Sequence, residues 1–173
     1  MEYILKVSSS IMIMNYDPKE NSLKNHIEQW LIEENISYNT INEPNHLFHF
    51  VLQNKDFNIP IEIFQEKNTS DLIVGIMIFL SNELNYNVYR FTQSEKEDFK
   101  IKVDEFLSTI RLDYRTGLRV GYDILNEKGH YGAKYFIKTK MDGCEKEKLL
   151  KILKLVKNTC MRSEEFLNKT LKK

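Results

Sequence analysis

The sequence predicts an α+β fold, an antiparallel five-stranded sheet with helices mainly on one face. Apolar residues at helical spacing occupy both ends of the chain, and segments with a two-residue repeat lie between them. Runs of strands separated from helices are typical of this fold class. The predicted order is α-β-β-β-α-β-β-α. The 173 residues suit one domain, expected at 15–173, behind an N-terminal extension at 1–14 that is either unstructured or an added strand.

The first helix is expected over residues 18–35. Asp17-Pro18 reads as a helix start, with Asp as the N-cap and Pro at the first helical position. Leu23 and Ile27 begin a series of apolar residues spaced three to four apart. This helix should therefore bury one stripe and expose the rest.

Three strands should follow the Asn-rich loop at 39–45. A two-residue repeat begins at Leu47, and a second one runs from Ile59 to Phe64. Pro60 cannot donate a ladder hydrogen bond, so it should lie at a strand start or an edge. The third segment, 72–80, consists of nine apolar residues including a glycine, which favours a central strand covered on both faces.

The second half should contain a helix and a strand pair. Ser94 and Glu97 have the spacing of a capping box, and the helix that they open should continue to Ile110. Strands are expected at 118–125 and 131–140, joined by a turn that contains Gly129. The aromatic connection before this helix has no pattern that assigns its backbone.

A final helix should run from its cap at Asp142 to about Leu171. One side of it is apolar and includes Cys160, which is therefore expected in the core rather than as a nucleophile. The opposite side is rich in lysine, a pattern that favours a solvated face. Cys144 lies near the start of this helix, where a helix dipole can lower a thiol pKa.

Composition argues against several classes of protein. The 25 basic and 25 acidic side chains cancel, so nucleic acid is not an expected partner. Two cysteines, expected sixteen residues apart on one helix, provide no disulfide framework and favour a reducing cytoplasm. No apolar run reaches the length that crosses a bilayer, so no membrane partner is expected.

The element order and the opening helix, with Ile27-Glu-Gln-Trp-Leu-Ile-Glu-Glu34, resemble the type III secretion chaperone-like (YbjN-like) fold. Within that fold the chain is similar, over Asn15 to Lys173, to an uncharacterised and largely archaeal family with a domain of unknown function. The resemblance implies a five-stranded sheet, often a homodimer, and a surface that holds an extended partner segment. It implies no catalytic residue, because the family has no established active site.

The four histidines do not form a recognisable site in the sequence. His46 and His49 lie at the entry to a strand, where a separation of three should point the two rings to opposite faces. No cysteine or second histidine pair stands nearby to complete a metal site. We therefore assign no catalytic residue, no metal ligand and no cofactor.

The segment 72–80 carries the main functional expectation. Its apolar side chains should reach both faces of the sheet, whereas the helices can cover mainly one. Another protomer, a ligand or a curled sheet edge could shield the second face. A homodimer is our first choice, because symmetric self-association is the commonest way to bury such a patch.

The predicted function is that of a non-enzymatic protein-binding or chaperone-like module that clasps a partner segment on its sheet. Edge addition uses main-chain hydrogen bonds and needs no special side chains. The alternatives are a small enzyme, for instance around His49 and Glu62, and a nucleic-acid binder that uses the basic final helix. The expected partner contacts are Tyr86, Tyr89, Phe91, Ile73 and Met77.

Overall fold

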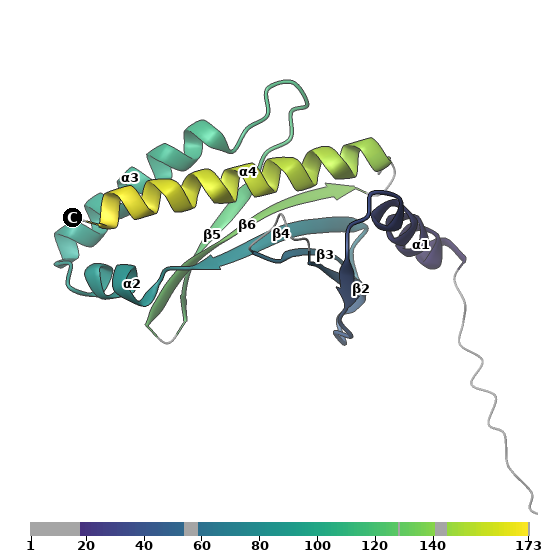
Figure 1. The fold of residues 1–173 in the computed structure, drawn as a ribbon, viewed down its shortest axis with the longest axis horizontal. Helices are drawn as coiled ribbons and strands as arrows, with labels where there is room; N and C mark the ends of the chain where they lie inside the picture. Colours follow the sequence, from purple (N-terminus) through teal and green to yellow (C-terminus); the bar gives the residue numbers. More distant parts are fainter. Residues whose placement is uncertain (1–17, 54–58, 128, 141–144, 173) are drawn as a thin grey trace, which may run out of the picture.

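The computed structural model describes residues 18–53, 59–127, 129–140 and 145–172. These residues form four helices and six strands (Figure 1). In chain order they are α1 (Pro18–Glu33), β1 (Tyr38–Thr40), β2 (His46–Leu52), β3 (Ile61–Glu66), β4 (Asp71–Phe79), α2 (Asn82–Tyr89), α3 (Gln93–Ile110), β5 (Gly121–Glu127), β6 (His130–Lys140) and α4 (Lys146–Leu171).

One antiparallel sheet contains all six strands, in the spatial order β1-β2-β3-β4-β6-β5. The α+β class and the antiparallel sheet are thus confirmed. The predicted central strand is β4, which pairs with β3 on one side and along its whole length with β6 on the other. Pro60 stands directly before β3, at a strand start as its missing N–H requires.

The predicted count of five strands is wrong, because β1 lies in the segment that was expected to be a loop. Tyr38 pairs with Leu52 and Thr40 with Phe50. The Tyr38 ring packs edge-on against Phe50 at 5.1 Å between ring centroids. Three residues are too few to show a two-residue repeat, so only the pairing with β2 defines this strand.

The connection that the sequence left unassigned contains a helix, α2. Ser81 caps it by accepting a hydrogen bond from the Leu84 amide at 3.3 Å. Leu84 and Val88 are its two buried apolar residues, one turn apart. Eight residues with a single apolar pair are too short for a helical pattern to stand out from the surrounding Asn and Tyr.

The start of α3 differs from the prediction by two residues. Thr92, not Ser94, is the N-cap, and its partner in the capping box is Glu95. The Thr92 amide donates to the Glu95 carboxylate at 2.7 Å, and the Glu95 amide donates to the Thr92 hydroxyl at 3.3 Å. Two overlapping Ser/Thr-x-x-Glu patterns occur here, and the fold uses the earlier one.

Several other expected features lie outside the described residues. They are the extension at 1–14, the caps Asp17 and Asp142, and Cys144.

The helices pack on one face of the sheet, as predicted. Figure 1 shows α4 running along the sheet with α3 beside it, and α1 at the β2 end. The C-terminal end of α1 meets the first turn of α4, where Lys146 forms 2.8 Å ion pairs with both Glu33 and Glu34. Cys160, on the sheet-facing side of α4, is buried in the core, and burial raises the pKa of its thiol to about 12. The prediction that it is a core residue is confirmed.

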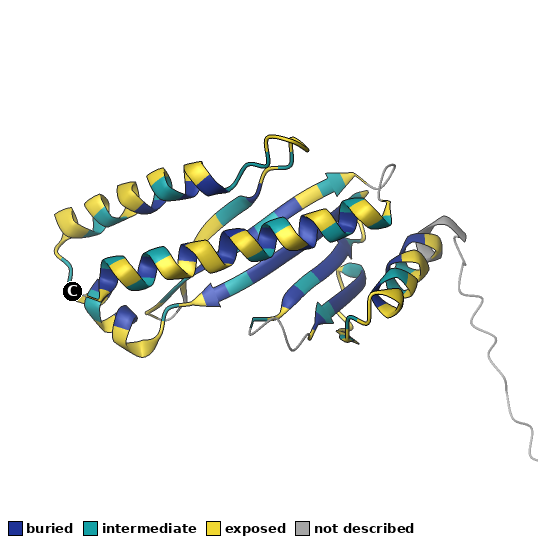
Figure 2. Cartoon of the chain, turned by 45° about the horizontal axis from the view of Figure 1, so that its top comes forward, coloured by how far each residue is buried: buried dark blue, intermediate teal, exposed yellow. Residues whose placement is uncertain are grey.

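The opposite face of the sheet, here called the open face, has no helix over it in the described part of the chain (Figure 2). Along β4 it carries Ile73, Gly75, Met77 and Phe79, and exposure rises from 4% at Ile73 to 46% at Phe79. Neighbouring strands supply the shielding at the Ile73 end. Within the described chain a helix layer covers one face of β4 only, and cover of the open face by another protomer, a ligand or a curled sheet edge stays a prediction.

Candidate partner-binding site

The last strand of the sheet, β5, has a free edge. Its seven residues pair with β6, and no other strand in the described residues pairs with them. Just before β5, the Val120 amide donates a hydrogen bond to the Arg111 carbonyl at 2.8 Å, next to an isolated β-bridge between Leu112 and Arg119. The chain itself therefore satisfies this part of the edge. From Gly121 onward the backbone groups on this edge are available to another strand.

An apolar pocket of about 200 Å³ lies next to this edge, between α3 and the helix-covered face of the sheet. Its walls come from β4, β5, β6, α2, α3 and the C-terminal half of α4. The residues that line it include Ile78, Val88, Phe99, Val103, Ile124, Tyr135 and Leu167. Nearly all of this lining is hydrocarbon. The pocket therefore suits an apolar side chain and offers few of the polar groups that a catalytic site needs.

Ile124 connects the edge to the pocket. It is paired with Ala133, whose side chain is in the core, so both point to the helix-covered face. Ile124 is nevertheless 47% exposed, because β5 has no neighbour on its outer side. A strand added there would lie about 4.8 Å away, with its own inward side chains next to Ile124.

A polar contact holds α3 near β5. The Tyr122 hydroxyl donates a short hydrogen bond to the Asp104 carboxylate on α3, and this bond raises the pKa of Tyr122 above its usual value. Lys96 and Lys100 stand on α3 at the pocket. Their aliphatic stems extend the apolar wall, and their ammonium groups favour acidic residues in whatever enters.

The three aromatic residues predicted as partner contacts lie on and just after α2. Tyr86 and Tyr89 are exposed, and Arg90 stacks over the Tyr86 ring at 5.6 Å. Phe91 packs edge-on against Phe99 of α3 at 5.9 Å between ring centroids. Phe91 is thus part of the packing that supports the pocket wall, whereas the two tyrosines face away into solvent.

The two aliphatic residues predicted as partner contacts, Ile73 and Met77, share the open face of β4. Ile73 is buried and Met77 is half-buried. The predicted set therefore falls on two different surfaces, the open face and the α2 region. The structure brings Ile73 and Met77 onto one surface and does not join them with the tyrosines.

Sequence reasoning missed Ile124 and the pocket beside it. One signal was present: Ile124 and Leu125 are adjacent apolar residues in a strand that otherwise alternates. Apolar side chains on both faces of an edge strand indicate that each face has something to contact. The pocket itself is made by six elements spread from β4 to α4, which no local pattern reports.

The prediction that His46 and His49 point to opposite faces is wrong. A β-bulge between His46 and Phe48 shifts the register, so the two rings come to the same side, 5.1 Å apart between centroids. Both rings also pack on Phe64. His49 is 7% exposed, and its Nε2 lies 3.7 Å from a Glu62 carboxylate oxygen.

This histidine cluster does not have the geometry of a general base or a metal centre. The 3.7 Å separation between His49 and Glu62 exceeds hydrogen-bond length. Within the described ranges, no group of three or more His, Cys, Asp or Glu side chains is arranged to hold a metal ion. The rings instead form one aromatic cluster with Phe64.

The stability of the protein should fall as the pH drops through the range just below 6.5, and His49 should be a cause. Burial holds the pKa of His49 below 6.5, against attraction by Glu62, while His46 and Lys134 lower it further and Glu43 raises it. In this pH range His49 is protonated to a greater extent in the unfolded chain than in the folded one. Acidification therefore favours unfolding. Urea unfolding from pH 7.5 to 5.5 measures this slope.

The matched variant is His49→Phe, which keeps an aromatic ring and removes the titration. Its stability should change less than that of the wild type between pH 7.5 and 5.5. The comparison variant is His130→Phe at the exposed β5–β6 turn, which should keep the wild-type slope. Equal slopes for all three proteins would show that His49 does not carry the effect.

Together, the sheet order, the helix-covered face and the apolar pocket define a small α+β protein whose β5 edge strand lies beside that pocket. The chain belongs to a family of uncharacterised conserved proteins, the domain of unknown function DUF2299, whose model matches residues 23–167. The crystal structure of an uncharacterised protein from Methanothermobacter thermautotrophicus has the same fold, with a TM-score of 0.72 at 17% identity. That match covers 86% of this chain and 98% of the archaeal one.

A search of curated proteins finds no significant match. Among the helices in the described ranges, none combines the length and the apolar character that a bilayer crossing requires.

Proposed function

We propose that this protein is a non-enzymatic, cytoplasmic binding module that holds an extended segment of another protein at the β5 edge. The observation that carries the proposal is the coincidence of a seven-residue free edge with an apolar pocket beside it. Peptide recognition by strand addition takes its affinity from main-chain hydrogen bonds and its specificity from pockets for alternate side chains. The resemblance to the secretion-chaperone fold points to the same mode of binding.

The geometry defines which segment would fit. Every second side chain of an added strand would point beneath α3, so one apolar side chain could enter the pocket and the next outward ones would face solvent. A volume of about 200 Å³ suits a single Leu, Ile, Met or Phe side chain. Lys96 and Lys100 would favour Asp or Glu beside that apolar residue.

Ile124→Glu should abolish binding of such a segment. The new carboxylate would stand at the pocket mouth, where it would repel acidic flanks and would lose its hydration under an added strand. Peptides of eight to ten residues, selected from a random displayed library on the wild type, are the probe. Their affinity for the variant, measured by fluorescence anisotropy, should fall at least about tenfold.

The control is Ile101→Glu, the same substitution on the solvent side of α3. Ile101 is 55% exposed, close to Ile124 in exposure, and does not line the pocket. This variant should bind the selected peptides as the wild type does, and hydrogen exchange should show β5 amides newly protected in the wild-type complex. Selected peptides that bind both variants equally well would exclude the β5 site.

We also propose that the open face forms a homodimer. Met77, Phe79, Phe136 and Leu125 lie on this face, and Phe79 is among the exposed large apolar residues of the described chain. Light scattering at micromolar concentration should give a mass near twice 20.6 kDa. Met77→Asp should shift that mass toward the monomer, whereas Ile32→Asp on the exposed side of α1 should not. A monomeric wild type would rule the dimer out.

A further inference from the structure

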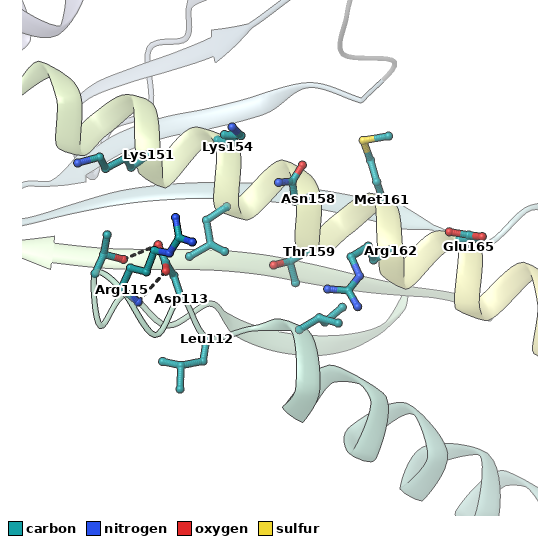
Figure 3. A pocket seen from close by; sticks show the side chains of 13 residues that line it. Leu112, Asp113, Arg115, Lys151, Lys154, Asn158, Thr159, Met161, Arg162 and Glu165 are labelled. Carbon is teal, nitrogen blue, oxygen red and sulfur yellow. Dashed lines mark hydrogen bonds between the residues drawn. The ribbon is translucent and has the colours of Figure 1, made fainter.

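A second groove, distinct from the β5 site, runs between α4 and the connection from α3 to β5. It is open, with a volume of about 1120 Å³, and extends along α4 from Lys151 to Glu165 (Figure 3). Its apolar part comes from Ile110, Leu112 and Leu155, and charged side chains surround it. Binding of a ligand in this groove would be independent of the proposed partner binding at β5.

The positive charges in this groove have no ion-pair partner within 4.0 Å in the described chain, whereas both carboxylates have ion-pair or hydrogen-bond partners. The four cationic side chains that line it are Arg115, Lys151, Lys154 and Arg162. In the described part of the chain, none of these four forms a salt bridge within 4.0 Å. The excess of unpaired positive charge makes the groove complementary to an anion.

The two carboxylates of the groove are already engaged. Glu165 pairs with Lys169, one helical turn further along, at 2.7 Å. Asp113 accepts hydrogen bonds from the Thr116 hydroxyl at 2.7 Å and from the Arg115 amide at 2.9 Å. The Thr116 hydrogen bond is the main reason that the pKa of Asp113 is lowered, and attraction by Arg115 contributes least.

A buried hydroxyl in the groove lacks a hydrogen-bond partner. Thr159 is 1% exposed, and its Oγ1 has no partner among the described residues. Figure 3 shows Thr159 and Arg162 on the side of α4 that faces the connection, with Arg115 reaching from the connection toward the helix. An unsatisfied buried hydroxyl is costly, and an acceptor bound in the groove beside Arg162 would satisfy it.

We propose that this groove binds the phosphate group of a small phosphate ester. Arginine suits phosphate because its planar fork can donate two parallel hydrogen bonds to the oxygens, and the Thr159 hydroxyl adds a donor. Ile110, Leu112 and Leu155 supply an apolar surface for the rest of the ester. The ligand class is therefore a phosphate carried by a partly apolar molecule, such as a nucleoside monophosphate.

A nucleic acid fits this groove less well. None of the residues that line it is aromatic, so it offers no platform on which the successive bases of a strand could stack. The chain as a whole has zero formal charge, which removes the long-range attraction that nucleic-acid binders use. A single phosphate group matches the local charge without requiring either feature.

The test is a titration of the full chain, followed by amide chemical shifts at constant ionic strength. The probes are inorganic phosphate, adenosine monophosphate, adenosine and an eight-residue oligothymidylate. Adenosine monophosphate should bind saturably, shift the amides around Thr159 and bind more tightly than inorganic phosphate, while adenosine should not bind. Thr159→Val and Arg162→Gln should each weaken adenosine monophosphate at least about tenfold, the usual effect of losing a hydrogen bond to a charged group.

The control is Lys102→Gln, which removes one positive charge from an exposed position of α3 outside the groove and should leave the affinity unchanged. Thr159→Val also separates a binding role from a packing role, because a purely structural threonine would leave the affinity unchanged. Unsaturable shifts, or equal affinity in all variants, would overturn the proposal. Oligothymidylate that binds more tightly than the monophosphate, and equally to Thr159→Val, would replace it with a nucleic-acid surface.

Discussion

Val74→Asp is expected to leave no folded protein at room temperature. Val74 lies in the middle of β4, fully buried on the helix-covered face, between Ile63 of β3 and Ile137 of β6. An aspartate there would place an unpaired carboxylate in the core, at a cost above about 5 kcal/mol. The whole free energy of unfolding of a domain of this size is only about 5–15 kcal/mol. Far-UV circular dichroism and urea unfolding measure the loss.

The comparison variant on the same strand is Met77→Asp, which changes the open face instead. Met77 is half-buried, so its new carboxylate can keep most of its hydration and should cost about 1 kcal/mol, mainly through the poor strand propensity of Asp. A folded Met77→Asp beside an unfolded Val74→Asp would confirm that β4 is enclosed by a helix layer on one side only. If Met77→Asp also failed to fold, the open face would be as dry as the core.

Gly132→Ala should lower the free energy of unfolding by about 1–3 kcal/mol, because it overpacks the contact between β4 and β6. A Cβ at this position would lie 2.5 Å from the Ile78 carbonyl oxygen and 2.8 Å from the Phe79 ring. The first of these atoms belongs to the backbone of the central strand. The strand pair would have to move apart to relieve the overlap, which urea unfolding would report as a lower midpoint with an unchanged slope.

Gly75→Ala is the matched control for Gly132→Ala. Gly75 lies on the same pair of strands, but a Cβ there would come no closer than 3.3 Å to the Tyr135 carbonyl oxygen. The small gain that Ala brings over Gly in a strand should largely offset this tight contact, leaving a change within about 1 kcal/mol. Equal losses for both variants would mean that close approach at Gly132 is not the cause.

Most of the regular elements could be predicted from local patterns. Residues 72–79 of the predicted segment 72–80 lie in the central strand β4, because a long apolar run favours a strand with neighbours on both sides. The long helix that carries Cys160 could be predicted because its apolar side continues over about seven turns. A repeat of that length does not arise by chance, as one in a few residues can. The two elements that were missed, β1 and α2, have three and eight residues and depend on contacts with β2 and α4.

The candidate sites were much less predictable than the fold. Tyr86 and Tyr89 were predicted as contacts because they are aromatic, and their side chains are exposed to solvent. Ile124 is a candidate contact because β5 has no strand on its outer side among the described residues. The histidine pair shows the same limit at the scale of one residue. A single bulge after His46 reversed the side on which its ring lies, and nothing in the spacing of His46 and His49 announces that bulge.

By itself the sequence determined the class of fold, the buried central strand and the absence of a strong net charge, because these follow from residue type and periodicity along the chain. Tertiary structure alone decided that β5 lies at a sheet edge, that an apolar pocket opens beside it, and that Thr159 and Arg162 of α4 lie across a groove from Arg115. The physical reason is that edges, pockets and charge clusters arise where elements distant in sequence meet. Their order in space depends on the packing of the whole domain and not on any local repeat.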